Sequence, residues 1–299
     1  MENREYKLGL LFGVASFGMW GMLPLYWKLV GAISPYQIFA HRVLWSFVFI
    51  VFIMIYKDYW KNFSKMVKDG RTIKFFIAPA IAISINWMLY IWSVNNGYVV
   101  EASLGYYINP LMLTAFGSLV YKEKMTKLQK LGLALAIIGV VVKTVLYGRV
   151  PVIALILATS FSVYGLLKKR SKWDSLTALA FETLIVGIPS LIFLIFVEVT
   201  GTGIRGNLPF YLVPLILLSG IATATPLILY AESAKRLPLS VLGFIQFLSP
   251  TISLLIGVFV FKEAFDISSM IGFSFIWVAL GLFIYSQVKI LKVNSSSNN

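Results

Sequence analysis

The chain has 299 residues, of which 59% are hydrophobic and only 13% are charged. Soluble domains contain about 45–50% apolar and about 25% charged residues, so this composition excludes an ordinary soluble globule and predicts an integral membrane protein. The net charge of +14 would fit a nucleic-acid-binding protein only if the basic residues formed one exposed face. They lie instead in short clusters between long apolar runs, so we expect no nucleic-acid partner.

The expected elements are ten helices, because ten apolar runs follow one another, most of them about as long as a hydrocarbon core of about 30 Å requires. Lipid offers no hydrogen-bond partner to an open backbone, and the alternation typical of membrane β-strands is absent. The predicted helices are 8–30, 36–56, 73–95, 101–121, 128–147, 151–167, 176–199, 209–234, 239–261 and 268–288. The polar segment 292–299 is predicted to be a disordered tail.

The distribution of lysine and arginine predicts how these helices are oriented. If the N-terminus is inside, the inside segments hold 20 of the 26 Lys and Arg residues and the outside loops hold 3. This asymmetry is the positive-inside signal, and it also supports an even number of spans. Both termini are therefore predicted to be cytoplasmic.

The second half of the sequence repeats the first at an offset of 140 residues. The identical pairs are Leu89/Leu229, Tyr90/Tyr230, Ser93/Ser233, Pro110/Pro250, Gly117/Gly257, Val120/Val260, Lys122/Lys262, Glu123/Glu263 and Gly132/Gly272. Each half holds five spans, and an odd number forces the second half to enter the membrane inverted. We predict two inverted five-helix repeats, 1–147 and 148–291, with a substrate site between them. Pro110 and Pro250 are predicted hinges, because proline frees a backbone carbonyl and bends a helix.

The types of residue present restrict the chemistry of the chain. There is no cysteine and only one histidine, which excludes disulfides and thiolate metal sites and leaves a Ser–His relay or a histidine metal site without partners. No GxxxxGK[ST] phosphate loop or HExxH motif is present, and all four aspartates lie between the apolar runs. We expect no metal, no cofactor and no enzymatic activity.

Charged residues inside the spans are the first candidates for a site, because each costs several kcal/mol unless it faces a cavity or a partner. Arg42 is expected to line a cavity, with snorkelling to the membrane surface as the alternative. Its neighbour His41 either lines the cavity or packs as a satisfied histidine. Glu182 occupies the repeat position of Arg42 and is expected to be a cavity acid. We expect Arg42 to pair with Glu101 rather than with Glu182, because the axial offset between Arg42 and Glu101 is smaller.

Other polar and aromatic residues extend the predicted site. Glu101 and Asn109 lie on one helix face, although Glu101 has a role in helix N-terminal stabilisation as its alternative. Deep tryptophans and tyrosines are expected to line an aromatic pocket, whereas most aromatic residues of membrane proteins belong to interfacial belts. The predicted cavity residues are Trp20, His41, Arg42, Trp87, Tyr90, Asn95, Asn96, Glu101, Tyr106, Asn109, Tyr164, Glu182, Tyr230 and Gln246.

Several stretches carry a family resemblance. They are Trp20-Gly21, His41-Arg42-Val43-Leu44-Trp45-Ser46, Val94-Asn95-Asn96, Glu101-Ala102-Ser103-Leu104-Gly105-Tyr106, Asn109-Pro110 and Phe275-Ile276-Trp277-Val278-Ala279-Leu280. They resemble the RarD family, a branch of the drug/metabolite transporter superfamily built from two EamA-type repeats. The resemblance covers nearly the whole chain. It implies an all-α membrane protein of ten helices in two inverted five-helix repeats, which exports small metabolites or drugs across a bacterial inner membrane.

Together these features predict a secondary transporter with a small-molecule substrate and membrane lipid as its partners. Energy would come from ion coupling or from the substrate gradient, since no nucleotide-binding motif is present. A channel or a lipid flippase is the alternative, and an intramembrane enzyme is less favoured. The substrate, the coupling ion, the direction of transport and the oligomeric state stay open.

Overall fold

The computed structural model describes residues 2–122, 125–169, 173–204, 209–234, 236–237 and 245–296. This part of the chain contains helices and no strand, as the apolar runs predicted. Seven of the described helices are long and apolar enough to cross a membrane. They are α1 (Glu2–Leu29), α2 (Pro35–Tyr56), α4 (Gly70–Asn95), α6 (Lys127–Tyr147), α8 (Ser175–Val199), α9 (Leu212–Ala234) and α12 (Ile267–Ser296).

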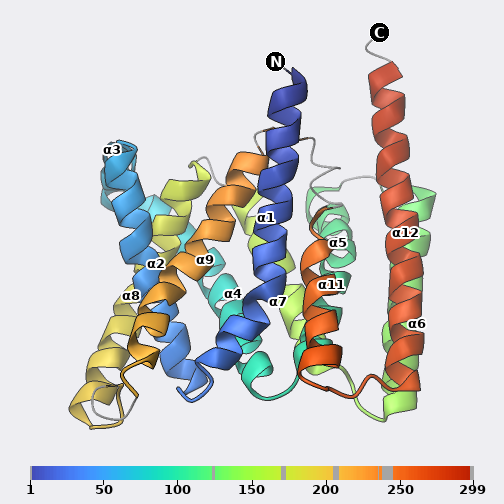
Figure 1. Ribbon diagram of the computed structural model, residues 1–299. Coiled ribbons are helices and arrows are strands. Elements are labelled where there is room, and N and C mark those ends of the chain that lie inside the picture. The colour runs from blue at the N-terminus through green and yellow to red at the C-terminus, as the bar shows by residue number, and fades with distance from the viewer. Residues whose placement is uncertain are drawn as a thin grey trace.

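Three further segments pack among these seven helices (Figure 1). They are α5 (Val99–Tyr121), α7 (Val152–Lys169) and the continuous pair α11 (Leu248–Leu255) and η1 (Ile256–Val260). α7 contacts α4 and α5, and α11 contacts α1 and α5. These three segments correspond to the fourth, sixth and ninth predicted runs.

Local capping fixes several helix starts close to the predicted boundaries. The Asp174 carboxylate accepts a hydrogen bond from the Thr177 backbone N–H at 2.9 Å and thereby starts α8. Thr126 and Gln129 form a reciprocal capping box at the start of α6. Such caps satisfy N–H groups that have no partner within the helix.

Residues 60–68 were expected to belong to a loop, but they form the helix α3 (Trp60–Lys68). Its Phe63 and Met66 are buried, whereas Lys61, Lys65 and Lys68 are exposed. This three- and four-residue spacing makes α3 amphipathic. Its lysines and its length of nine residues do not fit a transmembrane helix, so it was not predicted as a span. α3 lies at the end of the bundle where both chain termini lie (Figure 1).

The ninth run was predicted as one continuous helix over 239–261, and this is wrong in its described part. A turn at residues 246–247 precedes α11, and the last five residues form the π-helix η1. In η1 the Phe261 N–H bonds the Ile256 carbonyl at 2.9 Å, five residues back. Residues 238–244 lie outside the described part of the chain. π-turns are often found at functional sites.

The tail prediction also needs correction. α12 continues to Ser296, so residues 292–296 are helical where disorder was expected. Only residues 297–299 of that segment lie outside the description. The polar composition of this segment gave no sign that α12 continues through it, because a helix that extends beyond the apolar core needs no hydrophobic face.

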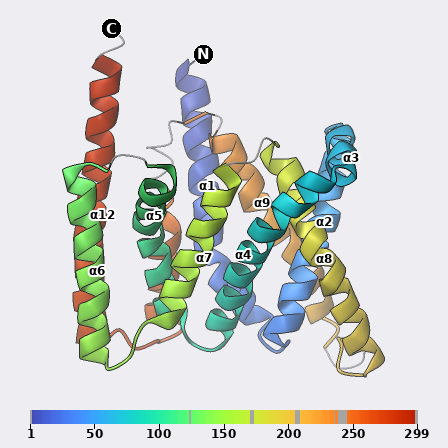
Figure 2. The same ribbon diagram turned by 180° about the vertical axis from the view of Figure 1, so that it is seen from behind.

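The two halves of the chain make equivalent contacts, as the sequence repeat implies. α1 packs against α9 and α11, and α7, its counterpart at an offset of 144 residues, packs against α4 and α5 (Figure 2). The Ser16 hydroxyl donates to the Pro226 carbonyl at 2.7 Å, while the equivalent Ser160 accepts a hydrogen bond from Asn86 at 3.1 Å. Asn86 and Pro226 are themselves 140 residues apart. Each half therefore inserts its first helix into the other half.

The repeated Lys-Glu pair also has a structural counterpart. Lys122 and Lys262 adopt the left-handed conformation, with φ of 56° and 57°. Lys122 ends α5, and Lys262 follows η1 by two residues. Non-glycine residues rarely adopt this conformation, so its recurrence at the repeat offset supports a true duplication.

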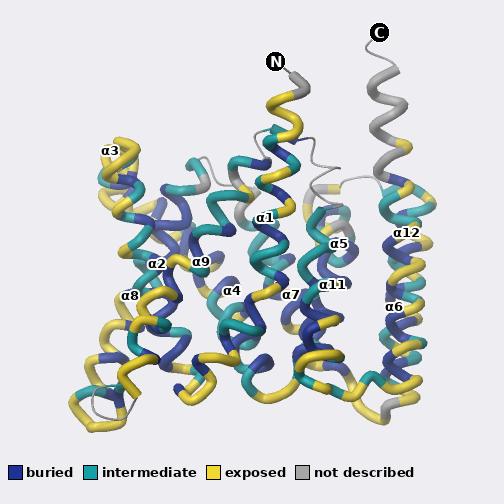
Figure 3. The backbone as a smooth tube through the Cα atoms, viewed as in Figure 1, coloured by how far each residue is buried: buried dark blue, intermediate teal, exposed yellow. Residues whose placement is uncertain are grey.

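Burial is concentrated on the faces that the helices turn toward one another (Figure 3). Large apolar side chains are exposed on the outward faces, among them Phe52, Leu119, Val145, Ile192 and Phe196. A soluble domain of this size would cover such faces, whereas a membrane protein presents them to lipid.

Candidate functional site

Arg42 forms the centre of the candidate site. It lies in α2, and only 3% of its surface is exposed. Its guanidinium carbon lies 5.0 Å from the ring centroid of Trp27 on α1 and 4.5 Å from that of Trp87 on α4. The Nε atom donates to the Thr223 hydroxyl on α9 at 2.8 Å. Four helices from both halves of the chain thus meet at one cation.

The close approach of α2 and α9 brings Arg42 and Thr223 together. Gly220, one turn before Thr223, lies directly against the backbone of Trp45 and Ser46. A side chain at position 220 would overlap that backbone, so glycine is required for this helix contact. The Thr223 hydroxyl in turn donates to the Ser219 carbonyl of its own helix at 2.9 Å, which fixes the orientation of the acceptor.

His41 is buried beside Arg42, with 8% of its surface exposed. Among the described residues, neither of its ring nitrogens has a hydrogen-bond partner. The packing role that the sequence analysis kept as the alternative required a satisfied histidine. Buried polar groups are normally hydrogen-bonded, so His41 stays a candidate to contact a polar group of a bound substrate.

Two tyrosines and an asparagine continue the site from Arg42 toward α7. The rings of Tyr90 and Tyr106 are 5.5 Å apart and nearly perpendicular. The Tyr106 hydroxyl donates to Asn86 Oδ1 at 3.0 Å, and Asn86 Nδ2 donates to the Leu157 carbonyl and the Ser160 hydroxyl at 2.9 and 3.1 Å. Asn86 is 1% exposed and was missed by the sequence analysis. A lone amide in the middle of the run 73–95 was the available signal.

A second polar group of the site pairs α7 with α8. Glu182, on α8, is 1% exposed and accepts a hydrogen bond from the Tyr164 hydroxyl at 3.0 Å. Phe161 connects the two groups, because its ring lies 6.3 Å from Tyr106 and 5.9 Å from Tyr164. A continuous aromatic path therefore leads from the Arg42 region to Glu182.

Four other predicted residues lie on α1, α5 and α9 and at the turn before α11. Asn109 donates to the Ser162 hydroxyl on α7 at 2.9 Å and is buried. The ring centroids of Trp20 and Tyr230 lie 5.9 Å apart. Gln246 lies at the turn before α11.

Asn95 and Asn96 are separate from the central residues. Both amides donate to carbonyls of their own helix, at Ile91 and Trp92 respectively, and Asn96 is exposed. Asn95 Oδ1 is buried beside Gly31 and has no hydrogen-bond partner in the described part of the chain.

The expected pair between Arg42 and Glu101 is wrong. Glu101 accepts a hydrogen bond from the Ile153 N–H at 3.1 Å, which caps α7, and lies 3.9 Å from the Arg149 guanidinium. In the described residues Arg42 forms no ion pair with any carboxylate, Glu182 included. Axial offset alone misled the sequence analysis, since Arg42 and Glu101 lie on helices that face different neighbours. The alternative role of Glu101 in helix N-terminal stabilisation agrees with the bond to Ile153, although the stabilised helix is α7 and not its own.

The predicted hinge prolines occupy different local settings. Pro110 lies inside α5 and is buried. Pro250 is the third residue of α11, just after the turn at 246–247. Because proline has no N–H, it leaves the Gln246 carbonyl without its helical partner, and the helix is interrupted there.

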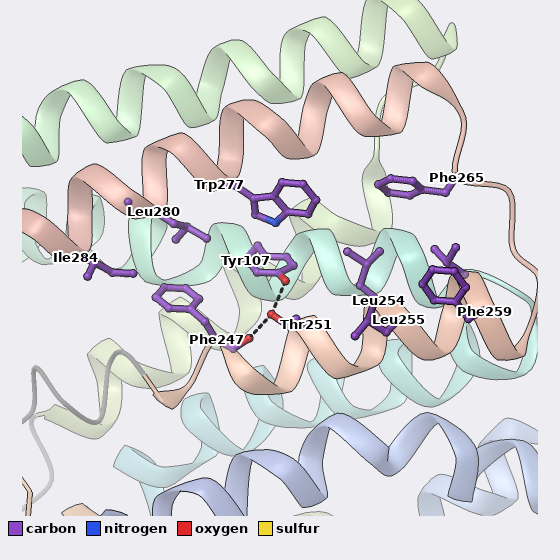
Figure 4. Close-up of a pocket in the computed structure, with 12 residues that line it drawn as sticks. Tyr107, Phe247, Thr251, Leu254, Leu255, Phe259, Phe265, Trp277, Leu280 and Ile284 are labelled. Atoms are coloured by element: carbon purple, nitrogen blue, oxygen red, sulfur yellow. Dashed lines mark hydrogen bonds between the residues drawn. The ribbon is translucent and has the colours of Figure 1, made fainter.

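Two cavities lie outside the Arg42 region. The larger, of about 500 Å³, is an apolar pocket between α5, α11, η1 and α12, in which the hydrogen bond between Tyr107 and Thr251 marks one wall (Figure 4). The smaller, of about 180 Å³, is lined by the starts of α5 and α12 and the loops beside them, at the bundle end opposite the termini (Figure 1). Its charged lining residues are Glu101, Lys143, Arg149 and Glu263.

Comparison with known proteins identifies the family. The EamA-like transporter family matches this chain over residues 7–145 and 149–285. The chain belongs to the EamA-like transporter family. It is therefore a multi-pass membrane protein of the drug/metabolite transporter superfamily.

Relatives within this family agree with the resemblance to RarD. The chain is 44% identical to an uncharacterized transporter, YojE, of Bacillus subtilis (strain 168), over 99% of this chain and 100% of that protein. It is 37% identical to the protein RarD of Streptomyces exfoliatus, over 96% and 91%. It is 36% identical to the protein RarD of Escherichia coli (strain K12), over 96% and 97%.

A solved structure supports the fold alone. It is titled "Crystal structure of protein", and it matches with a TM-score of 0.61 at 16% identity. The match covers 92% of this chain and 96% of that chain. The helical arrangement is thus shared with a protein of distant sequence.

Proposed function

We propose that this EamA-family protein is a secondary transporter that exports small organic metabolites or drugs across a bacterial inner membrane. Its ten transmembrane helices would form two inverted five-helix repeats, 1–147 and 148–291, with both termini in the cytoplasm. Substrate would bind between the repeats and face each side of the membrane in turn. Transport would need no cofactor.

The observation that carries this proposal is the buried Arg42 at the meeting point of both halves of the chain. Its contacts reach Trp27, Trp87 and Thr223, so a substrate that bound there would touch α1, α4 and α9 together. An ionisable group in the membrane interior is expensive and marks a pathway or a site in most membrane proteins. A rocking motion of one half against the other would change all these contacts at once.

The decisive experiment separates a carrier from a channel, a flippase and an enzyme. The purified protein is reconstituted into liposomes loaded with unlabelled phenylalanine, uridine or chloramphenicol, and uptake of the labelled compound is measured. A carrier accelerates labelled uptake when the same compound is inside, whereas a channel does not. Scrambling of a fluorescent phospholipid without solute exchange would favour a flippase, and chemical conversion of a solute would favour an enzyme.

A pair of tryptophan variants provides the matched control. Trp87→Ala removes a side chain that lies on Arg42, so exchange should fall by at least about tenfold, the equivalent of roughly 1.4 kcal/mol. Trp60→Ala removes a tryptophan of α3 that is 46% exposed, and exchange should stay near the unchanged rate. Equal rates in the two variants would contradict the placement of the site.

A further inference from the structure

Arg42 carries a positive charge that the described part of the protein does not neutralise. Its contacts are with uncharged groups, namely two indole rings and one hydroxyl. Its Nη1 atom is buried and has no hydrogen-bond partner among the residues that the structure describes. By contrast, Arg236 at the bundle end forms ion pairs with Glu5 and Glu232.

This arrangement holds an arginine ready for an anion. Tryptophan faces stabilise a desolvated guanidinium and fix its plane, but they accept no hydrogen bond within that plane. The planar guanidinium binds a carboxylate through parallel N–H bonds, and charge-assisted bonds of this kind are among the strongest in proteins. The free Nη1 is one such donor, and the Nε atom already has Thr223 as its acceptor.

We propose that Arg42 binds the carboxylate of a small organic anion, so that the substrates of this transporter are monocarboxylates with an apolar or ring-shaped body. This inference rests on the proposed transport function and names its substrate class. One unpaired cation matches one negative charge. A phosphate dianion would leave a buried negative charge uncompensated. The apolar body would contact the ring of Trp87, which lies on the guanidinium, and the paired rings of Tyr90 and Tyr106.

Three probes with the same skeleton test the charge requirement. They are 3-phenylpropanoate, 3-phenylpropanamide and 3-phenylpropylamine, and each is added to the purified protein in detergent while the melting temperature is recorded. A ligand that binds the folded state raises the melting temperature in proportion to its occupancy. The acid should stabilise the protein at a concentration about tenfold to hundredfold lower than the amide, because it gains a charge-assisted hydrogen bond. The amine should not stabilise it.

Variants locate the effect at Arg42. Arg42→Gln should abolish the stabilisation by the acid, whereas Arg42→Lys should retain preference for the acid with weaker binding, because lysine keeps the charge but loses the planar donors. Arg71→Gln is the matched control, since Arg71 is exposed at the start of α4 and its loss lowers the net charge equally. This control should bind the acid as the unchanged protein does.

The outcomes separate this inference from the proposed transport function. Equal stabilisation by acid and amide, binding that survives Arg42→Gln, or a response to chloride or phosphate alone would overturn the carboxylate site. If Arg42→Gln does not fold, the acid-to-amide comparison in the unchanged protein decides. Exchange of a neutral solute that is unaffected by Arg42→Gln would leave transport standing and overturn the anion inference. Binding of the acid without exchange of any solute would contradict transport alone.

Discussion

Glu263, which follows η1, accepts a hydrogen bond from the backbone N–H of Val100 at 2.8 Å through one carboxylate oxygen. Its other oxygen accepts from Val99 at 2.9 Å, so one side chain caps the first turn of α5. The residue belongs to the second half of the chain and the helix to the first. Glu263 therefore caps a helix of the opposite half of the chain.

Glu263→Ala should therefore destabilise the protein by about 1–3 kcal/mol, because two partly buried N–H groups lose their acceptor and the helix dipole loses a compensating charge. Glu263→Gln should cost less, since one amide oxygen still accepts. Thermal unfolding in detergent measures both. Asp58→Asn, at an exposed left-handed position that asparagine tolerates, should leave the melting temperature near its original value. A loss for Glu263→Ala no larger than that of the control would contradict the cap.

Asn86 should be essential to the packing of α4 against α7. Asn86→Leu removes the acceptor of the Tyr106 hydroxyl and the donor to the Leu157 carbonyl, so unfolding free energy should fall by about 2 kcal/mol or more. Tyr106→Phe removes only one bond and should cost about 1 kcal/mol. Denaturant titration compares the two variants. If Tyr106→Phe were the more destabilising, the hydrogen bonds of Asn86 to α7 would not be the main contribution.

The acid stability of the start of α12 should depend on Asp266. Hydrogen bonds from the Ser269 N–H and the Ser268 hydroxyl hold the pKa of Asp266 below its usual value of 3.8. The stabilisation is therefore complete above that value and is lost as pH falls through the lower pKa of the folded state. Asp266→Asn keeps an acceptor at the cap without the charge. Its melting temperature should be lower than that of the unchanged protein at neutral pH, and the difference should disappear in strong acid. A constant difference at every pH would show that the charge contributes nothing.

The orientation of the bundle can be tested because the chain has no native cysteine. Single cysteines at Asn96, Val150 and Phe210, which are exposed at the bundle end opposite the termini, should react with an impermeant thiol reagent added outside the cell. Cysteines at Lys61 and Lys127 should react only after the membrane is opened, because these residues lie at the end with the termini. Reversal of this pattern would mean that both termini are outside.

The long apolar helices were predictable from the sequence because their signal is strong and local. The predicted runs 36–56 and 176–199 differ by one residue at most from α2 and α8. α3 was not predictable by the same rule, since its lysines and short length make it resemble a loop. The interruption of the ninth run was also missed, because a turn and a π-helix leave the hydrophobic pattern intact.

Several residues of the candidate site could be singled out from the sequence, but the contacts between them could not be predicted. Arg42, Trp87, Tyr90 and Tyr106 stand out as polar or aromatic groups within apolar runs, and the structure brings them together. Which neighbour each contacts depends on how α1 and α7 insert into the opposite half. Sequence spacing carries no such information, so Thr223 and Asn86 were missed and Glu101 was assigned to the wrong partner.

The most direct test of alternating access uses a single cysteine at the acceptor of Arg42. Thr223→Cys should react with an anionic impermeant thiol reagent added to either face of sealed membranes, and 3-phenylpropanoate should slow both reactions. Ala279→Cys, at a fully buried position of α12 that packs against α6, should react from neither face. Reaction of Thr223→Cys from one face only would contradict a site that opens to both sides. A labelling rate of Thr223→Cys no higher than that of Ala279→Cys would contradict it as well.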